Sequence, residues 1–475
     1  MARNYFFVFL SQLVRLGANV VVFVAIARNY GPTAFGQFTT AHTLSTLFIL
    51  FADFGFDTLL ASEIARHRDR ASDLAHTYLS MKFIFALCSS VAMVLVARFR
   101  GLGPETISLI DVFSLYVFFS ALTNFFFALF KSFEEMHHEV RISFFMNLYL
   151  FVVVIALGIV HVAIYWLAVA FVSSRLLGGI LSLPTVQRLV QFRPSKLRLA
   201  TRREFRGISI FGFSTISGFL FFTADTLMLA WLTGDHEVGV YQAAIKIVGL
   251  SLLVSDIAFY SMLPVLNRYH AESTNQWVSI IRILHKFLSA TGVVIGFLIF
   301  VLAEPLISVV FGLRGFQATV PILRLFGITV FVRYFGEASA TSLTTSHKVI
   351  RRLVVMGGGV VLNIGLNLYA IPHFGAWGAC VVSLVTNIAI VLGYVIASAP
   401  ESAQWLLAPR NYSGISLAVV CGWIPFSVTG TLQVPATIVC TALVITVCYF
   451  GIFERRDRQR LIGALIEAVN RSSYH

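Results

Sequence analysis

Charged residues are scarce in this sequence. Lysine, arginine, aspartate and glutamate make up only 12% of its 475 residues, while hydrophobic types reach 58%. Soluble domains contain roughly 25% charged residues. The scarcity therefore excludes an ordinary water-soluble protein, and it is typical of a chain that crosses a membrane many times.

Cysteine is also rare. The five cysteines form no Cys-x-x-Cys pair, which excludes the usual zinc and redox motifs. All five lie in apolar stretches, where a thiol behaves as a small hydrophobic side chain; they are Cys88, Cys380, Cys421, Cys440 and Cys448. We therefore expect no metal and no cofactor, apart from a proton or sodium ion that drives transport.

Catalytic motifs are missing as well. The sequence contains no GxxxxGK[ST] phosphate loop, no HExxH, no GxSxG and no Asp-x-Asp pair. The longest connection expected on the extracytoplasmic side, 304–319, is too short to hold a catalytic domain. These absences exclude an ATP-driven pump, a conventional glycosyltransferase and a membrane-embedded polymerase with a large catalytic loop. We therefore predict that the protein is not an enzyme.

Long apolar stretches dominate what is present. About fourteen are long enough to cross a bilayer as helices, so the sequence predicts an all-α polytopic membrane protein. Their approximate limits are 5–27, 38–61, 79–97, 107–130, 142–160, 164–185, 207–231, 239–264, 283–303, 320–344, 353–371, 376–397, 412–428 and 432–453.

Basic residues are unevenly distributed between alternate connections. If the N-terminus is cytoplasmic, the cytoplasmic side receives most of them, including the dense run in 186–206 and those in the tail 454–475. The turns near 161, 235, 373 and 430, on the opposite side, contain none. This asymmetry follows the positive-inside rule. It places both termini in the cytoplasm and accounts for the net charge of +13 without nucleic acid as a partner.

The first and second halves of the sequence also resemble each other. At an offset of 203 residues, Gly31 aligns with Gly234, Gly36 with Gly239, and Asp53 with Asp256. Because six spans are an even number, the two halves would run parallel, as in transporters whose halves rock against each other. The domains predicted from this repeat are two six-helix lobes (1–185 and 207–397), a basic linker (186–206), two additional spans (398–453) and a basic amphipathic tail (454–475).

Several predicted spans contain a cation. Arg15, Arg175, Lys246 and Arg333 lie inside apolar stretches, where a charge facing lipid is costly. Gln12 and Asn19 share a helical face with Arg15 because they stand three residues before it and four after it. We interpret these six residues as candidates for binding an anionic substrate. For Arg175 and Arg333 the alternative is helix packing, which for Arg333 includes pairing with Glu337 four residues on.

Carboxylates also occur inside the spans. We interpret Asp53, Asp225, Asp256 and Glu337 as candidates for coupling or gating, because a desolvated carboxylate can carry a proton. Asp53 and Asp256 occupy equivalent repeat positions, which also fits a helix contact or a gate. Asp225 has the alternative role of balancing the charge of Lys246.

Four stretches carry a recognisable pattern. They are 27–36 (ARNYGPTAFG), 53–56 (DFGF), 239–246 (GVYQAAIK, preceded by Asp225) and 371–379 (IPHFGAWGA). The first two resemble the opening of polysaccharide-type exporters, the third the start of their second half, and the last a late-span signature. These exporters belong to the multidrug/oligosaccharidyl-lipid/polysaccharide (MOP) flippase superfamily. The match covers the first twelve spans and is specific for the superfamily, not for a sugar.

The resemblance implies a fold and a function. Two six-helix bundles would form a V around a central cavity, with the two extra C-terminal helices outside it. The protein would move a polyprenyl-diphosphate-linked oligosaccharide from the cytoplasmic to the periplasmic leaflet of the bacterial inner membrane. The prenyl tail would stay among the membrane lipids, and a polysaccharide polymerase and a chain-length regulator would act beside it.

Other functions stay open at this stage. Flippases of the lipid-linked peptidoglycan precursor also have fourteen spans. A cation-coupled small-molecule exporter of the same superfamily would need an acidic cavity, which the in-span cations oppose. A scaffold of a polysaccharide assembly complex is a further class, but it would leave those cations without a purpose.

Overall fold

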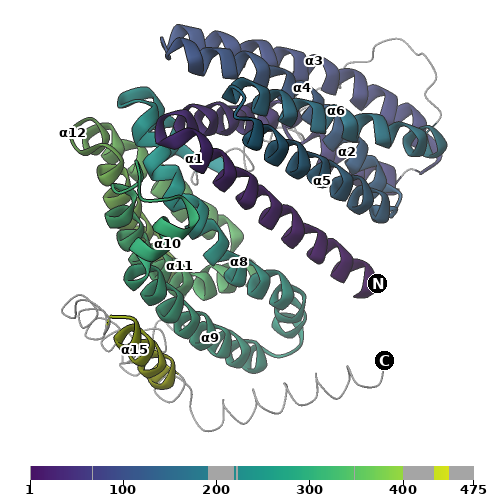
Figure 1. Cartoon of the computed structure of the whole chain (residues 1–475). Coiled ribbons are helices and arrows are strands. Elements are labelled where there is room, and N and C mark those ends of the chain that lie inside the picture. Colours follow the sequence, from purple (N-terminus) through teal and green to yellow (C-terminus); the bar gives the residue numbers. More distant parts are fainter. Residues whose placement is uncertain are drawn as a thin grey trace. The chain divides into compact units, whose positions relative to one another are not determined.

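The computed structural model describes residues 2–66, 68–190, 219–220, 223–346, 348–398 and 433–448. In these ranges every regular element is a helix and no strand occurs, which confirms the predicted all-α class (Figure 1). The elements are α1 (Ala2–Asp53), α2 (Phe56–Arg66), η1 (Arg68–Arg70), α3 (Ala71–Phe99), α4 (Pro104–Ser132), α5 (Met136–Val160), α6 (Ile164–Leu189), α8 (Asp235–Glu272), α9 (Thr274–Val301), α10 (Ala303–Val310), α11 (Thr319–Thr345), α12 (Val349–Ala397) and α15 (Gln433–Val447).

Eight of the described helices are long and apolar enough to cross a membrane: α3, α4, α5, α6, α8, α9, α11 and α12. The protein is therefore a multi-pass membrane protein. The predicted count of fourteen stays a prediction, because the predicted span 412–428 and the tail 454–475 lie outside the described residues, as do most of the linker 186–206 and most of span 207–231.

Two helices each cover two predicted spans. α1 runs through 5–27 and most of 38–61 and kinks at Gly31 (φ 78°), while α12 runs through 353–371 and 376–397 and kinks at Gly375 (φ 56°). Only glycine adopts these backbone angles at little cost. Each of these labels therefore joins two helices that meet at a sharp kink, which stands where we predicted a turn.

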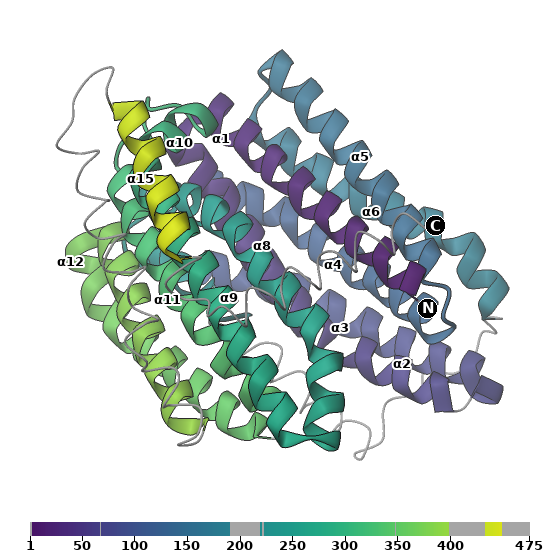
Figure 2. The same ribbon diagram turned by 90° about the horizontal axis from the view of Figure 1, so that it is seen from below.

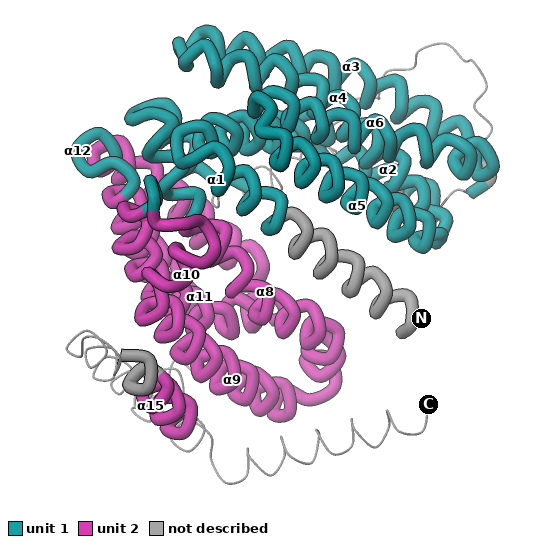
Figure 3. Tube along the Cα trace, in the orientation of Figure 1, with its two compact units in different colours: residues 1–243, 314–316, 371–376 teal, residues 244–313, 317–370, 377–475 magenta. Residues whose placement is uncertain are grey.

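The described chain forms two compact units (Figure 3). Unit 1 contains Met1–Ala243 with the short segments Arg314–Phe316 and Ile371–Ala376, and unit 2 contains the rest. The start of the second repeat thus packs with the first six spans. The predicted lobe boundary at the linker stays a prediction.

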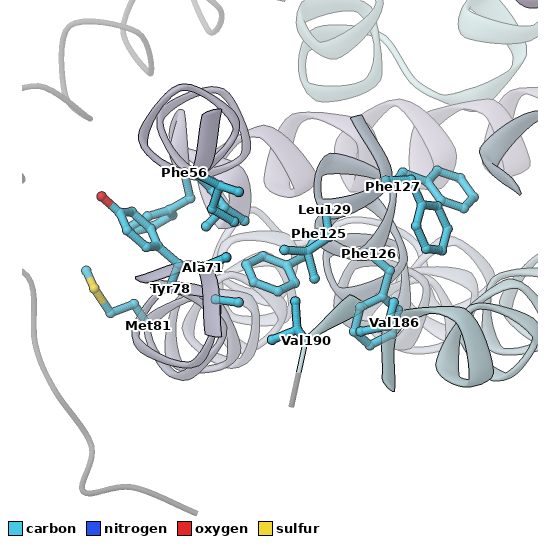
Figure 4. Close-up of a cluster of buried hydrophobic side chains, with 14 of the residues drawn as sticks. Phe56, Ala71, Tyr78, Met81, Phe125, Phe126, Phe127, Leu129, Val186 and Val190 are labelled. Carbon is cyan, nitrogen blue, oxygen red and sulfur yellow. The ribbon is translucent and has the colours of Figure 1, made fainter. Parts of the chain in front are cut away.

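Unit 1 is organised around α4, which packs against α1, α2, α3 and α6. Its aromatic residues Phe125, Phe126 and Phe127 belong to a buried apolar cluster with Phe56 and Tyr78 (Figure 4). Burying such side chains stabilises the helix contacts through dispersion and close packing, because lipid itself offers no hydrophobic driving force between helices.

Within unit 1, two glycines related by the 203-residue offset touch across the repeat. A Cβ atom at Gly36 would lie 1.7 Å from the Asp235 carbonyl oxygen, and one at Gly239 would lie 1.9 Å from that of Pro32. The same offset relates Pro32 to Asp235. The contact is therefore isologous, as two repeats make around a twofold axis.

Unit 2 contains a close pair of helices, α9 and α11 (Figure 2). A Cβ atom at Gly296 would lie 2.5 Å from the carbonyl oxygen of Gly327, so the two backbones touch without side chains between them. α15, in the predicted span 432–453, packs on α9 through Val444, Cys440 and Cys448. The buried cysteines there are packing residues, as we predicted for the cysteines as a group.

Candidate substrate and coupling residues

Arg15, Gln12 and Asn19 lie in the first part of α1. Their helical spacing puts them on one face, as the sequence predicted, but their side chains lie outside the described residues. Their role in binding a substrate stays a prediction.

Arg175 lies at the middle of α6 and is held by one tyrosine of α4. Its Nε and Nη2 atoms donate to the Tyr116 hydroxyl over 3.2 and 2.9 Å, and its guanidinium carbon lies 5.2 Å from the centre of that ring. Tyr116 packs in turn against His42, Phe113 and Phe171. Among the described residues no carboxylate pairs with Arg175. The guanidinium is thus oriented by a neutral group and keeps its full positive charge.

Asp225 and Lys246 lie on either side of the turn at Gly234. Asp225 is buried and accepts a hydrogen bond of 2.6 Å from the Tyr241 hydroxyl, while the neighbouring Thr226 accepts one of 2.6 Å from the Gln242 side chain. Lys246 lies one turn further along α8 and is half-buried. The hydroxyl of Tyr241 is thus a partner of Asp225 that sequence reasoning did not name.

Asp256, Arg333 and Glu337 come together in unit 2. Asp256 on α8 interacts electrostatically with Arg333 on α11, and Glu337 interacts with both. Arg352 on α12 joins them through Glu337, and it donates to the Thr344 hydroxyl over 2.6 Å. Two arginines thus face two carboxylates, which makes a balanced network that links three helices.

Arg352 was missed by sequence reasoning. It stands just before span 353–371, among the basic residues that we counted toward the positive-inside asymmetry. The structure brings its guanidinium to Glu337, to Tyr394 and over the ring of Phe259 at 5.5 Å. The sequence carried no signal for this, because the partners stand on other helices and far away along the chain.

Asp53 lies at the end of α1, beside a lysine that the sequence analysis also passed over. Lys82 of α3 is fully buried, and its Nζ atom lies 2.6 Å from Asp53 Oδ1 and 2.7 Å from Asp57 Oδ1. Lys82 stands one turn inside the predicted span 79–97. The depth argument that selected Lys246 would therefore have found Lys82 too.

No cluster of three or more histidine, cysteine, aspartate or glutamate side chains that could hold a metal ion occurs in the part of the chain that the structure describes. In the described ranges the candidate groups include a cation with no carboxylate partner there (Arg175), a balanced network (Asp256, Arg333, Glu337, Arg352), and a triad with one cation for two carboxylates (Asp53, Asp57, Lys82).

Comparison with known protein families identifies the family of this chain. A family model described as "Polysaccharide biosynthesis protein" matches residues 1–270, which is more than half of the chain. Among curated proteins, no sequence matches.

Solved structures share the fold at low sequence identity. The lipid II flippase MurJ in an inward closed conformation has a TM-score of 0.70 at 12% identity, covering 93% of this chain and 98% of its own. An inward-facing multidrug resistance MATE family transporter of the MOP superfamily has a TM-score of 0.64 at 15% identity, covering 83% and 96%. A MOP superfamily transporter from Pyrococcus furiosus, whose binding pocket is described as reversed in polarity, has a TM-score of 0.55 at 15% identity, covering 84% and 95%.

Proposed function

Because the chain belongs to the polysaccharide biosynthesis protein family and has the fold of MOP superfamily transporters, we propose that it is a flippase for a polyprenyl-diphosphate-linked oligosaccharide. It moves this lipid from the cytoplasmic to the periplasmic leaflet of the bacterial inner membrane for cell-surface or exopolysaccharide synthesis, including that of O-antigen. Both termini lie in the cytoplasm, and a polymerase and a chain-length regulator consume and limit the product.

The observation that supports this proposal most is the neutral hydrogen-bond partner of Arg175. A charge inside a span is costly unless it has a partner, and the described partner of this one is a neutral tyrosine hydroxyl. A guanidinium presents paired donors that match phosphate oxygens. Arg175 therefore fits the diphosphate of a lipid-linked sugar, and the aromatic rings around Tyr116 fit sugar faces.

The remaining candidates extend the binding site in this proposal. Arg15, with Gln12 and Asn19 on its face, and Lys246 contact the charged headgroup in a central cavity while the prenyl tail stays in lipid. Arg333 contributes less, because Asp256 and Glu337 already balance its charge. Transport follows alternating access of the two repeats.

Transport in this proposal is secondary. The carboxylates Asp225, Asp256, Glu337 and Asp53 are the candidates for binding a coupling ion or for gating, since no nucleotide motif is present. Each lies in a predicted span, where desolvation makes a carboxylate receptive to a proton.

A lipid-linked peptidoglycan precursor is the second candidate substrate. The likeness to MurJ extends over 93% of this chain, and that precursor would offer the same diphosphate to Arg175. A cation-coupled exporter of small molecules is the third candidate, but an unbalanced Arg175 would repel its positively charged substrates.

The test is flipping by the purified full-length protein in liposomes. The probes are undecaprenyl diphosphate carrying a labelled N-acetylhexosamine, the same lipid carrying a labelled oligosaccharide, and labelled lipid II. We expect the oligosaccharide lipid to be flipped fastest. Flipping of lipid II alone would assign the second candidate instead, and flipping of none of the three would contradict the proposal.

Arg175→Gln is the matching variant. Losing a charge-assisted contact of about 1.5–3 kcal/mol should slow flipping roughly ten- to one-hundredfold at limiting substrate. Arg98→Gln is the control, because Arg98 is exposed and paired with Asp111; it should flip at the wild-type rate. Equal rates for both variants would remove Arg175 from the site.

A further inference from the structure

One lysine and two aspartates form a triad inside unit 1. The Lys82 ammonium has no exposed surface and donates to Asp53 Oδ1 and Asp57 Oδ1 over 2.6 and 2.7 Å. The two carboxylates keep 22% and 19% of their side-chain surface exposed. The lysine is therefore sealed off within unit 1, while the carboxylates keep part of their surface exposed.

The triad is electrostatically isolated. In the described part of the chain, the charges that act on Asp53, Asp57 and Lys82 are those of the triad itself. Other titratable groups on the elements around it include Glu63 on α2, Asp73, His76 and Tyr78 on α3, and Lys131 at the end of α4, which pairs with Glu139. One ammonium thus faces two carboxylates, which leaves one negative charge in a predicted span.

The surroundings of the triad are apolar. Phe56 and Met81, next to Asp57 and Lys82 in sequence, belong to the buried cluster of unit 1 (Figure 4). Phe56 also packs edge-on against Phe85, one turn after Lys82. An unbalanced charge in such surroundings is costly, and binding one more cation would remove it.

We propose that Asp53 and Asp57 form a proton-binding site with Lys82 as its fixed counter-ion, and that this site couples proton flow to transport. On binding, one carboxylate, Asp57, becomes a carboxylic acid, and the ammonium keeps its proton and stays with Asp53. On release the same proton returns to water from the exposed side of the carboxylate. The coupling part rests on the proposed function; the proton site itself does not.

The geometry favours a proton over a sodium ion. A hard metal cation needs several oxygen ligands at once, whereas one oxygen of each aspartate is already taken by Lys82. The neighbouring side chains Phe56, Met81 and Phe85 offer no oxygen, and Tyr78, one turn before Lys82, offers a single hydroxyl. A proton needs only one carboxylate oxygen.

The triad also spans a break in the helix. α1 ends at Asp53, Phe54 and Gly55 have positive φ angles (41° and 87°), and α2 begins at Phe56. Lys82 of α3 holds both sides of this break, and the Asp57 backbone N–H donates to Asp53 Oδ1 over 3.3 Å. Neutralising Asp57 weakens the tie between α2 and α3 while the tie to α1 persists, so proton binding would free α2 to pivot at Gly55.

The first experiment measures proton binding without any substrate. Infrared difference spectra of the full-length protein in liposomes follow the carboxylic acid band as pH is changed. We expect a titrating band in the wild type that is lost in Asp57→Asn and kept in Asp111→Asn, the control for a carboxylate in an exposed pair. Asp57→Asn should fold, since it leaves Lys82 and Asp53 as a balanced pair.

The wild-type spectrum alone tests whether a carboxylate binds a proton, even if a variant fails to fold. No titrating carboxylic acid band between pH 4 and pH 9 would overturn the proposal, with that range chosen to bracket the ordinary carboxyl and histidine values. A band that sodium chloride alone displaces at constant pH would assign the site to sodium and would also overturn it.

The second experiment measures coupling. Flipping of the lipid-linked oligosaccharide is compared with and without a pH gradient across the liposome. We expect the gradient to accelerate the wild type and Asp111→Asn, whereas the flipping rate of Asp57→Asn should be the same with and without the gradient. Wild-type flipping that ignores the gradient would overturn the coupling and leave the flippase assignment standing; no flipping at all would instead contradict the proposed function.

Discussion

At the scale of single residues, the cations inside the spans differ in what balances them. Arg333 and Arg352 share Asp256 and Glu337, and their charges link helices. Arg175 has a tyrosine hydroxyl in the described part of the chain. Depth alone would rank these residues equally, whereas their partners separate a charge-balanced network from the arginine that we propose to bind an anion.

Tyr116→Phe tests the orienting role of that hydroxyl. The change removes the acceptor of both Arg175 hydrogen bonds but keeps the ring, so the guanidinium loses its orientation and not its charge. We expect the unfolding free energy to fall by about 1 kcal/mol and the flipping rate at limiting substrate to fall roughly tenfold. Thermal unfolding and liposome flipping measure the two effects. A wild-type flipping rate would show that Tyr116 only packs.

At the scale of elements, glycines decide where helices bend and where they touch. Gly31 and Gly375 bend α1 and α12, while Gly36 and Gly239 allow the two repeats to meet backbone to backbone in unit 1. The positive-inside rule predicts that this meeting point lies on the side away from the cytoplasm. We call this contact the closure, because any side chain at either glycine would push the two turns apart.

Gly239→Ala tests the closure. Its Cβ atom would lie 1.9 Å from the Pro32 carbonyl oxygen, and the backbone cannot yield without separating the two turns. We expect a loss of roughly 1–3 kcal/mol in unfolding free energy and faster hydrogen exchange in peptides covering 32–40 and 235–243.

Gly249→Ala is the matched control on the same helix, because nothing lies within 4 Å of its Cβ position. Alanine there should leave exchange in both peptides unchanged. Equal exchange in Gly239→Ala and Gly249→Ala would contradict the role of the glycine contact.

At the scale of the whole molecule, the chain is a multi-pass helical membrane protein of the polysaccharide biosynthesis protein family, and its sequence has no nucleotide-binding motif. Energy for the proposed flipping must then come from an ion gradient or from removal of the product.

Nucleotide independence is the corresponding prediction. Purified protein in liposomes should flip the lipid-linked oligosaccharide at the same rate with and without ATP and magnesium, because the sequence contains no phosphate-loop motif. A rate that rises only when ATP is added would refute secondary transport at once.

Much of the fold follows from the sequence alone. Apolar runs about 20 residues long must be helices in a bilayer, since only internal hydrogen bonds can satisfy the backbone there. The 203-residue offset likewise pointed to Gly36 and Gly239 as equivalent positions, and the structure shows in addition that they contact each other. The sequence also marked Arg175, Arg333 and Asp53 as candidate site residues. A charge is costly in an apolar stretch, and the apolar stretches can be read from the sequence.

Partners were decided only by tertiary structure. Asp53 stands 29 residues from Lys82, and Arg175 stands 59 from Tyr116; both pairs form because neighbouring helices pack side by side. Arg352 looked like one more cytoplasmic charge until α11 and α12 brought it to Glu337. The hydropathy of a stretch is the sum over its residues, so the sequence alone specifies which charges lie inside the membrane. Which charges neutralise one another depends on helix contacts, and these form between residues far apart in the chain.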